Sequence, residues 1–203
     1  MSGHSSAGST SGGGDKRERI LEAAIRVFAG KGFFNSKVSE IAREAGVADG
    51  TIYLYFKSKD DLLISLFEDR MERINQALRE RLPREPSAEA KLRRFIEMHL
   101  DLVEKHRALV EVLTVELRQS AKFMREYKNP KFGEFLRLLA AIIEDGQRAG
   151  ELRAGVPPTL VARAIFGALD ELSLARALGK SDPISATQVA DLLLSGLRGR
   201  RHT

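Results

Sequence analysis

The chain has 203 residues, 43% of them hydrophobic and 6% aromatic, which is enough for a sizeable core and excludes an intrinsically disordered protein. Lysine and arginine number 33 against 28 acidic residues, a mildly basic balance that suits an anionic partner such as nucleic acid. Without cysteine there is neither a disulfide framework nor a thiolate metal site, and a reducing cytoplasm fits best. The longest apolar run, residues 138–143, is far short of the roughly 20 residues of a membrane span, and no signal-peptide stretch is evident.

The N-terminal part of the chain predicts a tail and two helices. Residues 1–14 are almost all serine, glycine and alanine, a composition typical of a flexible segment. From Asp15 onward, hydrophobic residues recur at spacings of three and four until Gly32, which predicts the first helix. Ser36 is the expected N-cap of a short second helix, which Gly46 can end in the left-handed conformation.

Seven further helices are expected, and no window alternates with period two, so we predict an all-α fold of about nine helices. One short helix starts near Ala48 and a long connecting helix follows it. The later segments are opened by Ser87, by Asn129 with Pro130, by a Pro-Pro pair and by Ser185. The expected ranges are 48–56, 59–82, 87–106, 106–120, 129–149, 157–179 and 185–199.

The second and third helices, joined by a glycine-containing turn, have the spacing of a helix-turn-helix, whose second helix lies in the DNA major groove. Val47, Ile52 and Phe56 fall on its inward side, which leaves the other residues free to meet DNA. Gly50 costs about 1 kcal/mol of helix stability relative to alanine, and close approach of a phosphate or base edge would account for it. A frayed first turn is the alternative.

The stretch "VSEIAREAGVADGTIYLYFKSKDDLL", residues 38–63, resembles the DNA-binding signature of TetR-family repressors. "ELRQS" at 116–120 and "IFGALDE" at 165–171 are similar to the fatty-acid-degradation repressors of that family, which bind long-chain acyl-CoA. The resemblance spans about residues 15–200. It implies a DNA-binding domain at 15–58 and an effector-binding and dimerisation domain at 59–203. It also implies a homodimer that binds a pseudo-palindromic operator in double-stranded DNA, is released by acyl-CoA and is not an enzyme.

The resemblance assigns DNA-contacting roles by position. Tyr53 takes a place that reaches a base edge or phosphate, and the polar start of the second helix meets phosphate. Two positions depart from the pattern: Ala48 replaces a common serine cap, and Asp49 brings a carboxylate that either complements the helix dipole or accepts a hydrogen bond from cytosine. The implied DNA-binding residues are Ser36, Lys37, Gly50, Thr51, Tyr53, Tyr55 and Lys59.

An acyl-CoA effector requires an apolar tunnel and cations for its phosphates, with no separate cofactor. Arg118 with Gln119 is expected at the tunnel mouth, although a solvated helix end would explain both. Lys91, Arg93, Arg94 and Lys105 are less specific cations. The candidate tunnel-lining residues, each of which could equally be plain core, are Leu100, Val103, Leu109, Leu113, Leu117, Leu138, Leu139, Ile142 and Phe166.

Rival functions find less support. His99 and His106 lie seven residues apart, about 10 Å along a helix, and no nucleophile motif of the Gly-x-Ser-x-Gly type occurs, so neither a metal site nor a hydrolase is expected. A multidrug or other small-hydrophobic-ligand sensor on the same fold is the main alternative. The low aromatic content and the lack of tryptophan weigh against a stacking pocket.

The last two helices carry the expected dimer interface, a four-helix contact between two chains. Small and apolar residues recur along one face of each helix. They are Ala164, Ala168, Leu172 and Ala175 on the first, and Val189, Leu192, Leu193, Gly196 and Leu197 on the second.

Overall fold

The computed structural model describes residues 11–180, 183 and 185–198, with side chains from residue 14 onward. The regular elements of this part of the chain are helical, and one isolated β-bridge joins Leu152 to Arg198, so the predicted all-α class is confirmed. The helices are α1 (Ser11–Lys31), α2 (Val38–Ala45), α3 (Asp49–Tyr55), α4 (Lys59–Arg81), α5 (Ala88–Lys105), α6 (Arg107–Glu111), α7 (Leu117–Gln119), α8 (Ala121–Arg125), α9 (Pro130–Arg148), α10 (Pro158–Ala177) and α11 (Ala186–Ser195). A 3₁₀ turn, Leu82–Arg84, follows α4, and a π-helical segment, Val112–Glu116, lies between α6 and α7.

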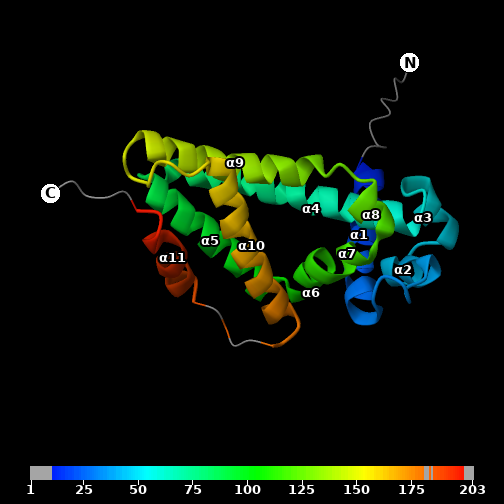
Figure 1. Ribbon diagram of the computed structural model, residues 1–203. Coiled ribbons are helices and arrows are strands. Elements are labelled where there is room, and N and C mark those ends of the chain that lie inside the picture. Colours follow the sequence, from blue (N-terminus) through cyan, green and yellow to red (C-terminus); the bar gives the residue numbers. More distant parts are fainter. Residues whose placement is uncertain (1–10, 181–182, 184, 199–203) are drawn as a thin grey trace, which may run out of the picture.

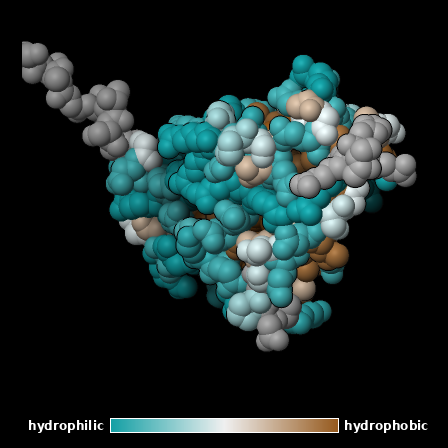
Figure 2. All heavy atoms as spheres, turned by 90° about the vertical axis from the view of Figure 1, so that its left-hand side faces the viewer, coloured by the Kyte–Doolittle hydropathy of each residue, from teal (hydrophilic) through white to brown (hydrophobic). Residues whose placement is uncertain are grey.

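The helices form two connected parts (Figure 1). α1, α2 and α3 gather at one end, and α4 runs from them along the molecule with α9 beside it. α5, α10 and α11 fill the other end, while α6, α7 and α8 lie between the two parts. One continuous hydrophobic core extends from Ile20 in α1 to Leu194 in α11. The end that carries α11 is mainly hydrophilic, with hydrophobic side chains confined to small patches (Figure 2).

The first helix begins and ends close to the predicted positions. α1 starts at Ser11, four residues before the expected Asp15, so residues 11–14 belong to it and not to the predicted tail. Residues 1–10 lie outside the described part of the chain. Gly32 follows the helix with φ +77°, the left-handed conformation that glycine adopts most easily.

The second helix starts one residue later than predicted, because Lys37 and not Ser36 is its N-cap residue. The Lys37 N–H donates to the Glu40 carboxylate at 3.0 Å, and this leaves the Ser36 hydroxyl for another role. Ser36 is buried, and its hydroxyl donates to the Gly32 carbonyl at 2.6 Å. Gly46 ends the helix with φ +65°, as predicted.

The predicted starts of the later helices are confirmed, since Ser87, Asn129 and Ser185 are N-cap residues whose side chains accept a backbone N–H. The expected single helix over 106–120 is wrong. Thr114 is β-branched, and its hydroxyl donates to the Val110 carbonyl at 2.8 Å in the region where the backbone widens into the π-helical segment. Ser120 then caps α8, an unpredicted helix, which brings the α-helices of the described chain to eleven.

The described helices include none that is long and apolar enough to cross a lipid bilayer.

Candidate nucleic-acid interface and effector cavity

The third helix presents its outer face to solvent. Ile52 and Phe56 are buried and hold α3 in the core, whereas Tyr53 is 58% exposed and Leu54 82% exposed. A Cβ atom added at Gly50 would meet nothing within 4 Å, so no packing inside the chain requires a glycine here. The sequence analysis did not predict an exposed Leu54, because a leucine in an amphipathic pattern is usually a core residue.

A depression separates the start of α2 from the exposed face of α3. Its walls bring together four of the residues predicted to contact DNA: Ser36, Lys37, Tyr53 and Lys59. Lys57, which the sequence analysis missed, also lines it. The Lys37 and Lys57 side chains are exposed, and neither ammonium has a partner among the described residues. Thr51 and Tyr55 are half-buried nearby, with the Tyr55 ring centre 6.3 Å from that of Phe56.

Lys59 is engaged inside the protein. Its ammonium donates to the carbonyls of Phe33, Phe34 and Ser36 at 2.6, 3.2 and 3.0 Å, which uses all three of its donors. It also lies 4.6 Å from the centre of the Phe33 ring, a cation–π contact. In this geometry Lys59 holds the loop between α1 and α2, and its contact with phosphate stays a prediction. The buried Ser36 hydroxyl is likewise turned inward, toward the Gly32 carbonyl.

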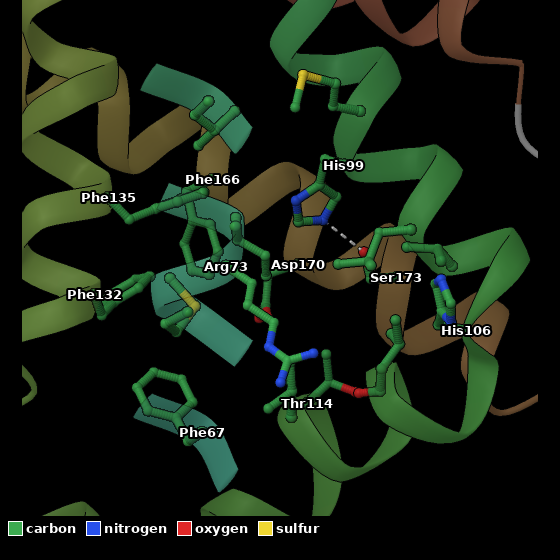
Figure 3. Close-up of a pocket in the computed structure, with 18 of the residues that line it drawn as sticks. Phe67, Arg73, His99, His106, Thr114, Phe132, Phe135, Phe166, Asp170 and Ser173 are labelled. Carbon is green, nitrogen blue, oxygen red and sulfur yellow. Dashed lines mark hydrogen bonds between the residues drawn. The ribbon is translucent and has the colours of Figure 1, made fainter. Parts of the chain in front are cut away.

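The second part of the chain encloses a cavity of about 580 Å³. Figure 3 shows Phe132, Phe135 and Phe166 on one side of it, with His99 and Ser173 across from them. Of the predicted lining residues, Val103, Leu113, Leu117, Arg118 and Phe166 line this cavity. The other predicted residues do not line it. Gln119 is half-buried, and the rest belong to the packed core or its margin: Leu100, Leu109, Leu138, Leu139 and Ile142.

Aromatic rings form much of the wall, against the expectation from composition. Six of the chain's ten phenylalanines line the cavity, so a low overall aromatic content does not argue against an aromatic-lined site. Phe166 contacts Phe132 edge to face, with ring centres 4.7 Å apart. Met71 and Ile74 of α4 and Met98 of α5 complete an apolar interior suited to a flexible hydrocarbon chain.

One polar pair faces this apolar interior. His99 Nε2 lies 2.9 Å from the Ser173 hydroxyl, which itself donates to the Leu169 carbonyl, so the imidazole is the donor. Burial lowers the pKa of His99 to about 4, despite the opposing effect of the nearby Asp170 carboxylate. His99 is therefore neutral at physiological pH and offers Nδ1 as an acceptor.

Cationic side chains surround the cavity. Arg118 lies in its wall, but Nη2 is 2.5 Å from an Asp170 oxygen, and Nη1 donates to the Thr114 carbonyl. Arg94 and Lys105 pair with Glu97 and Asp101, at 3.1 and 2.9 Å. Arg81 is exposed and has no ion pair with any residue the structure describes. The described chain contains no cluster of three or more histidine and acidic side chains that could hold a metal ion.

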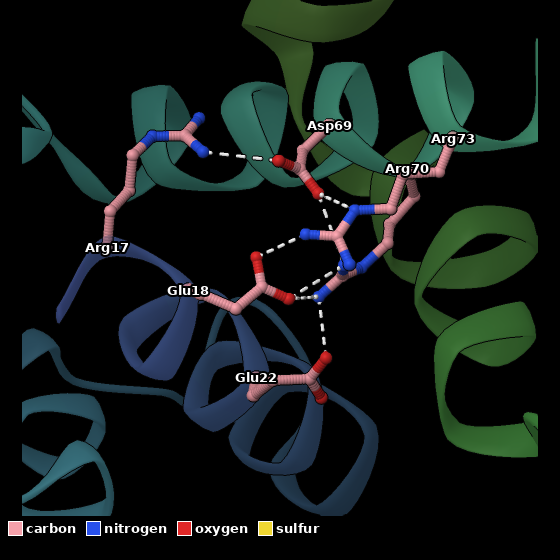
Figure 4. Close-up of polar contacts among 6 residues, drawn as sticks. All are labelled: Arg17, Glu18, Glu22, Asp69, Arg70 and Arg73. Atoms are coloured by element: carbon pink, nitrogen blue, oxygen red, sulfur yellow. Dashed lines mark hydrogen bonds and ion pairs between the residues drawn. The ribbon is translucent and has the colours of Figure 1, made fainter. Parts of the chain in front are cut away.

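A buried cation connects the two parts of the molecule (Figure 4). The Arg70 side chain of α4 is 6% exposed and contacts the carboxylates of Glu18, Glu22 and Asp69 at 2.7 to 3.1 Å. Arg73, which also lines the cavity, pairs with Glu18 and Asp69. We call these residues, together with Arg17, the Arg70 cluster. It joins the first half of α1 to the middle of α4.

Comparison with known proteins gives concordant matches along the chain. Residues 20–66 match the family model of bacterial regulatory proteins of the tetR family, and residues 67–182 match that of the C-terminal region of YsiA-like proteins. The fatty acid metabolism regulator protein of Bacillus subtilis is 37% identical over 188 residues, which cover 91% of this chain and 97% of that protein.

Two solved structures share both fold and sequence. The transcriptional regulator FadR from Bacillus subtilis, in complex with stearoyl-CoA, has a TM-score of 0.83 and 37% identity, covering 88% of this chain and 98% of that one. The fatty acid degradation regulator FadR from Bacillus halodurans has a TM-score of 0.81 and 36% identity, covering 89% and 99%.

Proposed function

The chain belongs to the TetR family of bacterial transcriptional regulators, and from this premise we propose that it represses genes of fatty-acid degradation and is released from operator DNA by long-chain acyl-CoA. Its relatives are regulators and not enzymes. The observation that carries the effector assignment is the apolar cavity with cations around it, in a fold whose Bacillus subtilis relative binds stearoyl-CoA.

We infer that α3 enters the major groove with Gly50, Thr51, Tyr53 and Tyr55 toward DNA. The exposed Leu54 adds an apolar side chain suited to a thymine methyl group. Lys37 and Lys57 supply the phosphate contacts, and Lys57 thereby takes the role that the sequence analysis assigned to Lys59. The protein would act in the cytoplasm, where its DNA lies.

A second copy of the chain is the expected partner through α10 and α11, and exposed apolar residues on these helices support this. Leu160 and Leu192 are 57% and 76% exposed, and Ala164 and Gly196 are exposed as well. Val189 departs from the predicted face, because it is buried against the protein's own core. Sedimentation at micromolar concentration tests this, and a monomer would contradict it.

Gly50→Ala tests the DNA-binding role by separating function from stability. The added methyl group meets open space, so helix propensity should raise the free energy of unfolding by up to about 1 kcal/mol. Operator affinity should nevertheless fall about tenfold. Gly30→Ala in α1 is the matched control, since its Cβ also meets nothing within 4 Å and its operator affinity should not change. Equal operator affinity in both variants would place Gly50 outside the interface.

The effector assignment is tested by titrating an operator complex with stearoyl-CoA, stearate and CoA separately. Only stearoyl-CoA should release DNA, because the cavity holds the acyl chain and the cations hold the phosphates of the CoA part. Arg81→Ala should weaken stearoyl-CoA binding about tenfold, as loss of a charge-assisted hydrogen bond predicts. Arg84→Ala is the matched control, an exposed arginine just past α4 that does not line the cavity. Release by a flat aromatic compound instead would favour the multidrug-sensor alternative, which the six phenylalanines keep open.

A further inference from the structure

The π-helical segment Val112–Glu116 lies between the cavity and the DNA-binding helices. Leu113 and Thr114 line the cavity, as does Leu117 at the start of α7. On its other side, this segment and α6 pack against α1. π-helical turns are rare and frequent at functional sites. In their wider i→i+5 winding, residues three apart lie further apart around the axis than in an α-helix, which lets Leu113 and Glu116 face different neighbours.

Glu116 is the residue that reaches the DNA-binding helices. It is 6% exposed, and its carboxylate accepts the Phe33 backbone N–H at 2.5 Å. The carbonyl of the same Phe33 accepts from the Lys59 ammonium at 2.6 Å. The loop that leads into α2 is therefore held from two sides, by an anion on its N–H and by a cation on its carbonyls. Its position sets where the start of α2 lies, and with it the depression lined by Lys37 and Lys57.

A second contact from the same stretch of chain reaches the first turn of α4. The Ser120 hydroxyl donates to Asp60 at 2.6 Å while it accepts the Phe123 N–H that caps α8. Arg118, between these two contacts, is anchored on Asp170 in the cavity wall. Three side chains of residues 116–120 thus bind the α1–α2 loop, α10 and α4 in turn.

We propose that residues 112–120 form a relay that carries the occupancy of the cavity to the DNA-binding helices, with Glu116 as its positioning residue. A ligand that presses on Leu113 and Leu117 changes the winding of the π-helical segment and withdraws the Glu116 carboxylate from the Phe33 N–H. The α1–α2 loop then loses one of its two supports, and α2 and α3 leave the geometry that fits DNA. The relay rests on the proposed function, because it takes operator release as the result of ligand binding.

Glu116→Leu is the main test, with operator binding measured by fluorescence anisotropy on a duplex that the parent protein selects from a random library. In the parent, stearoyl-CoA should lower operator affinity by about 5- to 150-fold, the usual range of allosteric coupling. In Glu116→Leu, operator affinity without ligand should already be lower by a factor in that range, and stearoyl-CoA should change it less than about threefold further. Affinity for stearoyl-CoA without DNA should be retained.

Two variants separate the relay from general damage to the fold. Glu126→Leu removes an exposed carboxylate just after α8, one whose side chain has no hydrogen bond or ion pair in the described chain, and should behave as the parent does. Glu116→Gln keeps a side-chain oxygen that can accept the Phe33 N–H and should restore most of the ligand response. If Glu116→Leu does not fold, Ser120→Ala takes its place and should show the same loss in weaker form.

The outcomes distinguish the relay from the effector assignment. Parental operator affinity and parental ligand response in Glu116→Leu would overturn the relay while leaving the effector in place. If stearoyl-CoA does not lower the operator affinity of the parent, the effector assignment fails and the relay fails with it, because no ligand response remains for residues 112–120 to carry.

Discussion

Two sets of polar contacts tie the DNA-binding helices and the start of α4 to the rest of the molecule, and they differ in chemistry. The Arg70 cluster places one buried guanidinium among three carboxylates between α1 and α4. Glu116 and Ser120, by contrast, make single hydrogen bonds in which an uncharged donor, the Phe33 amide or the Ser120 hydroxyl, meets a carboxylate. Both sets lie on segments that also line the cavity, α4 through Phe67, Met71 and Ile74, and residues 112–120 through Leu113, Thr114 and Leu117.

Because of this difference, we expect one set of contacts to stay intact when a ligand binds and the other to be broken. Separating a buried cation from its partners typically costs about 3–5 kcal/mol, whereas a hydrogen bond to a charged group contributes about 1.5–3 kcal/mol. The Arg70 cluster therefore keeps α1 fixed on α4, so that both move together. The contacts of residues 116–120 are weak enough for a bound ligand to exchange them.

Arg70→Met should cause the largest loss of stability. It leaves Glu18, Glu22 and Asp69 facing one another without their shared buried partner, and we expect the free energy of unfolding to fall by about 3 kcal/mol. Urea denaturation measures this. Arg19→Met is the control, because its pair with Asp15 spans 3.7 Å between exposed side chains and should contribute less than about 1 kcal/mol. If both variants lose the same free energy of unfolding, the buried position of Arg70 does not make its ion pairs more stabilising than an exposed pair.

Ser120→Ala should cost less, about 1–2 kcal/mol, from losing the hydrogen bond to Asp60 and the cap on the Phe123 N–H. The same denaturation measurement applies, with Ser195→Ala as control, since that exposed hydroxyl bonds only the Leu192 carbonyl of its own helix. A loss larger than that of Arg70→Met would reverse the proposed division between a fixed and an exchangeable connection.

The part of the fold that local signals determine could be predicted from the sequence. Gly46 marks the turn between α2 and α3, and Ser87 and Asn129 begin their helices, because caps and left-handed glycines act through neighbouring residues only. Inward-facing Ile52 and Phe56 followed from the 3.6-residue period in the same way.

The cavity could not be predicted, because it depends on how distant helices pack. Phe67 and Met71 carry the same periodic signal as any core residue of α4, and they become cavity wall only where α5, α9 and α10 leave space. Leu139 and Ile142 carry that signal too, yet they face the packed side of α9. The inward contacts of Lys59 could not be predicted for a related reason, because they depend on the conformation of a loop 25 residues away in sequence.

The smallest expected effect is on the pH dependence of the Tm, and it again tests the Arg70 cluster. Burial alone would raise the pKa of Glu18, but hydrogen bonds and charges from Arg70 and Arg73 outweigh it and hold that pKa below the usual range of a glutamate. A carboxyl group with a depressed pKa in the folded state stabilises the protein above its unfolded-state pKa, and this stabilisation disappears as the pH falls through the folded-state value. Glu18→Gln should therefore lower the Tm at pH 7, and the gap to the parent should close between about pH 5 and pH 3. The gap is expected to be modest because the Glu18 side chain is 34% exposed and solvent screens the pair. Thermal melts across this range, with Glu44→Gln as an exposed control that pairs with Arg26, give the comparison. A gap that stays constant with pH would show that Glu18 supports α1 through packing and not through its charge.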